Sequence, residues 1–143
     1  MTTETNKALV VRFVDEFWSK GNLAAADELM APEAVIHQPE VGGVAGLKAF
    51  NTTIRAAFPD WYSTAEELIA EGDRVAERWT GRGTHQGEFQ GIPPTGKQVA
   101  VPGVVFYRVR DGRISEFRGS FDMLSMLLQL GVAPAVAPQS PRR

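Results

Sequence analysis

The chain has 143 residues, of which 43% are hydrophobic, and this length and composition predict a single globular domain with a buried core. Its 15 basic and 17 acidic residues give a net charge of -2, and because the basic residues are scattered, we do not expect a nucleic-acid-binding surface. The absence of cysteine excludes disulfides, thiolate metal sites and cysteine nucleophiles.

The sequence gives no indication of membrane insertion or export. No apolar run approaches the roughly 20 residues that a membrane-spanning helix needs. Residues 1–6 are polar and lack the basic and apolar regions of a signal peptide. We therefore expect a cytoplasmic protein without a membrane partner.

The first half of the chain is predicted to be mainly helical. Apolar residues recur at helical spacing in three segments, which predict helices over 5–20, 23–30 and 44–58. Thr5 or Asn6 is the expected N-cap of the first helix, and Gly21 is expected just after its end. A short strand is expected over 33–38.

The second half is predicted to be a sheet followed by one helix. Alternating or continuous apolar runs predict strands over 62–70, 74–82, 87–90, 98–109 and 113–121. Turn signals at 72–73 and 111–112 join neighbouring strands as antiparallel hairpins. The last helix is expected over 123–130, with Gly131 after it.

This order of elements predicts an α+β fold. Helices come first and antiparallel strands follow, so the helices should cover one face of a strongly bent sheet and leave a cavity between the two layers. The domain is expected to span 1–131, with 132–143 as a loosely ordered tail rich in Ala, Val and Pro.

Asp122 is the main candidate for chemistry, because it stands between the last strand and an apolar helix. Spacing alone favours a helix N-cap, a position where aspartate accepts backbone N–H bonds. The alternative is an acid–base carboxyl facing the cavity, which would need its pKa raised by burial.

The two histidines lie far apart, so no metal site is predicted. His37 ends the short strand and could relay a proton or donate to a carbonyl; a structural hydrogen bond to the backbone explains it equally well. His85 lies in the Gly/Pro-rich segment 83–96, where turn packing or exposure is favoured over a role in binding.

Strand alternation places Glu77 and Trp79 on one face and Arg78 on the other, without deciding which face is inside. An inward Arg78 would need a carboxylate partner, either Asp122 or Glu116. Alternate residues of the last predicted strand are polar. That side of the strand is either a hydrated wall of the pocket or part of the outer surface. For the cavity we predict six substrate-binding residues, although aromatic residues at this spacing are more often core: Phe13, Phe50, Trp61, Arg78, His85 and Arg118.

With these features in view, the chain resembles the SnoaL-like polyketide cyclase family, a group within the NTF2-like cone-shaped α+β barrels. The resemblance covers about residues 6–131. The segments that carry it are 6–13 with 21–22, 36–39, 56–60, 72–76 with 78–79, 83–96, 111–114 and 122–131.

The resemblance implies cofactor-independent acid–base chemistry of the kind used in antibiotic biosynthesis. Asp122 would take a proton from an activated carbon of an aromatic polyketide ester, and the enolate would close a ring by intramolecular aldol addition. His37 would donate to the enolate oxygen. The resemblance also implies a homodimer through the outer sheet face, consistent with the run 99–106, which is apolar on both sides of its strand.

The chain departs from the family pattern at one point. It carries Glu116-Phe117-Arg118 where many relatives carry Glu-His-Trp. Two alternatives therefore stay open. One is a hydroxylase or epoxide-opening reaction in the same cavity, and the other is a non-catalytic module that binds a small ligand.

Overall fold

The computed structural model describes residues 2–37 and 42–132. Five strands and several helices form an α+β domain, as the sequence predicts. The helical segments are α1 (Thr3–Phe13), the π-helical turn η1 (Val14–Ser19), α2 (Ala24–Leu29), α3 (Gly43–Ala57) and α4 (Met123–Gln129). The strands are β1 (Met30–Ile36), β2 (Tyr62–Glu71), β3 (Arg74–Thr84), β4 (Gln98–Arg110) and β5 (Arg113–Phe121).

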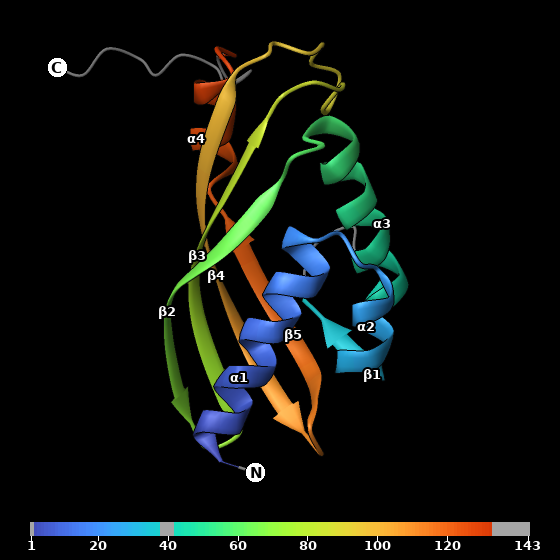
Figure 1. Cartoon of the computed structure of the whole chain (residues 1–143), viewed down its shortest axis with the longest axis vertical. Coiled ribbons are helices and arrows are strands. Elements are labelled where there is room, and N and C mark those ends of the chain that lie inside the picture. Colours follow the sequence, from blue (N-terminus) through green and yellow to red (C-terminus); the bar gives the residue numbers. More distant parts are fainter. Residues whose placement is uncertain (1, 38–41, 133–143) are drawn as a thin grey trace, which may run out of the picture.

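The strands form one curved sheet in the order β1-β5-β4-β3-β2, and the sheet is not closed. Strands β2 to β5 are antiparallel, as expected, and β1, whose partner the sequence does not predict, runs parallel to β5. Figure 1 shows α1, α2 and α3 along one face of the sheet, with α4 at the end farthest from the N-terminus.

The first helix begins earlier than predicted. Thr2 is the N-cap, and it forms a reciprocal capping box with Thr5, which sits three positions inside. Asn6 is buried and donates to the carbonyl of Gly72, so neither predicted cap residue was correct. The helix then widens into η1 and ends before Gly21, whose φ of 70° suits glycine.

The pleat of β4 separates a buried face from an exposed one. Val101, Val105 and Tyr107 point toward the helices and are buried, whereas Val104 and Phe106 point outward and are 48% and 59% exposed. The apolar run 99–106 is thus covered on one face within this chain.

Segment 87–90 does not form the predicted strand. Phe89 and Ile92 make a single bridge around a tight turn at Gln90 and Gly91, both of which have positive φ. Within 2–37 and 42–132 no helix is both long enough and apolar enough to cross a membrane.

Glycines inside the strands make room for tryptophans on the inner sheet face. A Cβ atom at Gly81 would overlap the indole of Trp61, and one at Gly103 would overlap the indole of Trp79. Because both glycines have extended backbones, their role is to leave space rather than to permit positive φ.

We expect Gly103→Ala to lower the free energy of unfolding by about 1–3 kcal/mol, because the added methyl displaces the Trp79 ring. Urea denaturation followed by tryptophan fluorescence measures the change. Gly42→Ala is the matched control, since no described residue lies within 4 Å of its Cβ position and its φ is negative. Equal stability of the two variants would contradict this account.

Candidate functional site

An apolar cavity lies between the inner sheet face and the helices. It is lined from η1, α3, α4 and strands β2 to β5, and it has a volume of about 40 Å³, room for a few water molecules. Seven of its fifteen lining residues are aromatic: Trp18, Phe50, Trp61, Trp79, Tyr107, Phe117 and Phe121. Such a wall suits a planar apolar ligand.

One carboxyl group contributes to this wall. Glu77 points inward from β3 and is only 2% exposed. Its Oε1 accepts a hydrogen bond of 2.7 Å from the Tyr107 hydroxyl. Among the described residues, its Oε2 has no hydrogen-bond partner.

Burial controls the ionisation of this pair. Loss of hydration raises the pKa of Glu77 to about 7, and the hydrogen bond from Tyr107 opposes the rise. The pKa of Tyr107 is raised well above 10 by its own burial and by the nearby Glu77 carboxylate. Near neutral pH Glu77 can therefore either release or accept a proton, while Tyr107 stays a donor.

Sequence analysis placed Glu77 beside Trp79 on one strand face but did not select it as functional. The signal was present, because Val75, Trp79 and Gly81 share its parity and form a face suited to burial. A carboxyl on that face is buried once the face is turned toward the helices. What the pattern lacked was Tyr107, which reaches Glu77 from the neighbouring strand.

Asp122 caps α4, as spacing favours. Its Oδ1 accepts from the Ser125 backbone N–H at 2.9 Å, and its side chain is exposed. It does not line the cavity, although Phe121 and Met126 do. A catalytic role for Asp122 stays a prediction.

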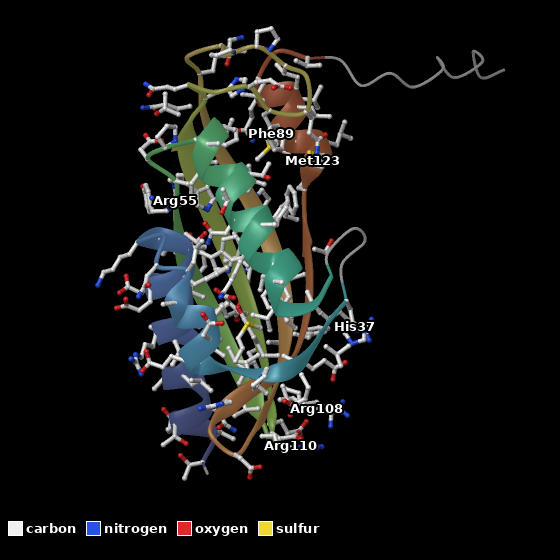
Figure 2. All side chains as sticks on the ribbon, turned by 90° about the vertical axis from the view of Figure 1, so that its right-hand side faces the viewer. His37, Arg55, Phe89, Arg108, Arg110 and Met123 are labelled. Atoms are coloured by element: carbon white, nitrogen blue, oxygen red, sulfur yellow. The ribbon has the colours of Figure 1, made fainter. Side chains whose placement is uncertain are left out.

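His37 belongs to a polar cluster outside the cavity. Its Nε2 lies 2.6 Å from Oε2 of Glu116, and Glu116 also lies 3.3 Å from Arg108 and 3.8 Å from Arg118. Partial burial acts to raise the pKa of Glu116, but the hydrogen bond with His37 and the charges of both arginines outweigh it and lower the pKa. In Figure 2, His37 and Arg108 lie on the same side of the molecule, well below Met123.

The structure does not bring His37 and Asp122 together. The backbone N–H of His37 donates to the carbonyl of Phe117, and Asp122 follows five residues later. Five residues of extended strand span about 16 Å. One small substrate atom cannot contact both side chains in this arrangement.

The six predicted substrate-binding residues divide by location. Phe50 and Trp61 line the cavity. Phe13 is fully buried in the main core and stacks on Phe17 at 5.0 Å. Arg78 and Arg118 point outward, because the pleat turns Glu77 and Phe117 inward. Arg78 instead pairs with Glu67 across the strands at 3.3 Å, so neither inward partner considered for it applies.

His85 is fully buried in the packing of segment 83–96, which excludes the exposed alternative. Its Nδ1 accepts from the Thr95 N–H at 3.1 Å, so a neutral imidazole carries its proton on Nε2. The ring also packs on Phe58 at 5.4 Å, and backbone bonds join His85 to Gly96 and Lys97. These contacts hold the segment against α3, outside the cavity wall.

We expect Glu77 to make stability depend on pH. Its pKa is raised on folding, so its contribution to stability is fully present below pH 4.5 and is lost as the pH rises to about 7. The loss amounts to roughly 3 kcal/mol. Glu77→Gln should abolish this part of the pH dependence in urea denaturation from pH 4.5 to 8. Exposed Glu67→Gln is the control, and an unchanged profile in Glu77→Gln would contradict the assignment.

Comparisons with known proteins agree on one family. Residues 8–130 match the family model of the SnoaL-like polyketide cyclases. The chain is 30% identical to the aklanonic acid methyl ester cyclase DnrD of Streptomyces peucetius over 105 residues, which cover 73% of this chain and 72% of DnrD.

Two similar crystal structures come from Streptomyces. AclR of Streptomyces galilaeus, a proposed hydroxylase, is 32% identical with a TM-score of 0.85, covering 94% of this chain and 90% of AclR. IdmH of Streptomyces antibioticus, a proposed polyketide cyclase, is 36% identical with a TM-score of 0.81, covering 89% of this chain and 99% of IdmH. The chain therefore belongs to the SnoaL-like polyketide cyclase family and has its NTF2-like fold.

Proposed function

We propose that this protein is a cofactor-independent acid–base enzyme that closes a ring in an aromatic polyketide ester by intramolecular aldol addition. The observation that carries the proposal is the aromatic cavity between sheet and helices, in a chain of the polyketide cyclase family. Similarity to DnrD, whose name specifies an aklanonic acid methyl ester cyclase, supports an ester of this class as substrate.

The reaction makes modest demands on the protein. A base removes a proton from a carbon between two carbonyl groups, and the resulting enolate attacks a ketone in the same molecule. The new alkoxide then takes a proton back, so no oxidant or cofactor is consumed. An apolar cavity contributes by folding the chain so that the reacting carbons meet, which can supply several kcal/mol of the barrier reduction.

The substrate must displace aromatic side chains on entry, because a multi-ring ester is larger than the 40 Å³ available. Three half-buried rings form a connected wall: Trp18 packs on Phe50 at 6.3 Å, and Phe50 packs on Phe121 at 6.2 Å. Rotation of these rings opens the cavity without breaking the sheet.

The direct test incubates the protein with an aromatic polyketide methyl ester that carries a β-keto ester side chain. Ring closure produces an isomer of unchanged mass, separated by liquid chromatography with mass detection. Phe50→Ala should lower kcat/KM about tenfold, corresponding to roughly 1.4 kcal/mol of lost ring contact. Val11→Ala, at an exposed position of α1, is the control. If the wild type forms no isomer from any such ester, the proposal is refuted.

A second candidate is hydroxylation, favoured by the similarity to AclR, a proposed hydroxylase. The same experiment separates the two reactions, because a hydroxylated product gains one oxygen atom while a cyclised product keeps its mass. Binding of the ester with quenched tryptophan fluorescence and no product would instead indicate a non-catalytic ligand-binding module.

The proposal includes a homodimer through the outer sheet face. Ile69, Val104 and Phe106 are exposed there at 62%, 48% and 59% in the single chain. Charged pairs lie beside them, Arg78 with Glu67 and Arg108 with Glu116, so a second copy meets both an apolar centre and charges of both signs.

We expect sedimentation velocity at micromolar concentration to show a dimer, and Phe106→Glu to shift the protein to monomer because it buries an unpaired charge at the interface. Val11→Glu is the control, since Val11 is 45% exposed on α1, which packs on the inner sheet face. A monomeric wild type would rule out this interface.

A further inference from the structure

Glu77 is one of the residues that line the cavity. On β3 it lies opposite Val105 of β4, and Trp79, Val105 and Tyr107 around it all line the cavity. Asp122, the carboxyl that family resemblance favours, lies outside this wall. The cavity wall therefore contains a carboxyl other than the one that the family resemblance points to.

Only one of the two carboxyl oxygens of Glu77 is hydrogen-bonded to a described residue. Oε1 accepts from Tyr107, whereas Oε2 is buried and has no partner among the described residues. Leaving a buried polar atom unpaired costs about 1–3 kcal/mol, more for a charged group. A glutamine would accept the same bond from Tyr107 without placing an ionisable group in an apolar cavity, so the structural role alone does not require a glutamate.

We propose that Glu77, oriented by Tyr107, is the group that takes and returns the proton during ring closure. The inference rests on the proposed function and names its catalytic carboxyl. The free Oε2 is the reacting atom, and Tyr107 is a positioning residue that acts through Oε1.

The proton that Glu77 takes from the substrate is returned to the product within the cavity. The Glu77 carboxylate takes the proton from the carbon between two carbonyls, so the C–H bond breaks, an O–H bond forms on Oε2, and the electron pair stays on the enolate. The enolate carbon then bonds to the ketone carbon. The oxygen of that ketone receives the proton from Oε2, which restores the carboxylate.

The surroundings keep this titration simple. Among the described residues that line the cavity, Glu77 and Tyr107 are the only titratable ones; the walls from η1, α3, α4, β2 and β5 contribute aromatic, aliphatic and serine side chains. The pKa of Glu77 of about 7 gives both protonation states near neutral pH. Proton removal should therefore rise with pH and level off above about pH 7.

The test follows exchange of the activated C–H of an aromatic β-keto ester for deuterium, by proton NMR in D2O, because exchange reports proton removal without requiring ring closure. Glu77→Gln should lower the enzymatic exchange rate at least about 100-fold, the usual contribution of a general base. Glu4→Gln, the same change at an exposed position of α1, should keep the wild-type rate. Tyr107→Phe should move the rising limb of the pH–rate curve to higher pH, because the carboxylate loses its hydrogen bond.

Outcomes separate the two proposals. A folded Glu77→Gln with the wild-type exchange rate, or a loss confined to Asp122→Asn, overturns the role of Glu77 and leaves the proposed function standing. If the wild type exchanges the activated C–H of no aromatic β-keto ester, the proposed function is overturned, and the proposed role of Glu77 is overturned with it. Circular dichroism establishes folding, and Glu77→Asp, which keeps the carboxyl, should retain measurable exchange if Glu77→Gln is inactive.

Discussion

The architecture depends on the burial of one face of a curved sheet under helices. Apart from Glu77, the inward positions of β3, β4 and β5 are mainly apolar, aromatic or glycine. Phe13 packs on the rings of Tyr107 and Phe117, and Phe17 stacks on Phe13. At about 25 cal/mol per Å² of buried apolar surface, this contact is the main source of stability. The glycines that admit Trp61 and Trp79 explain how bulky rings fit without separating the layers.

The same burial produces the chemistry. A carboxyl in water ionises near pH 4.5, but at 2% exposure the charged form of Glu77 loses its hydration, and its pKa moves to about 7. Stability is lower at neutral pH as a result. Such a cost is typical of functional sites, where ionisable groups are held in low-dielectric surroundings.

The polar residues outside the cavity have evident structural partners. Asp122 holds the N-terminus of α4, His37 pairs with Glu116 where β1 meets β5, and His85 secures the segment that follows β3. Aspartate and histidine side chains are common acid–base groups, so each of these residues is a candidate for catalysis by residue type alone. Their contacts account for them by capping, edge pairing and loop packing. Glu77 differs from them because it lines the cavity, although among the described residues His85 Nε2 is, like Glu77 Oε2, buried without a hydrogen-bond partner.

The sequence by itself determined the α+β class, the family, the hairpins at Gly72 and Gly112, and the ends of α3 and β5 within a residue, because these follow from local periodicity and turn chemistry. Only the tertiary structure decided that β1 pairs parallel to β5 and that Glu77 rather than Arg78 faces inward. Alternation divides a strand into two faces, but the choice of inner face depends on distant helices. The contact of Tyr107 with Glu77 likewise depends on strand register, which is set across the whole sheet.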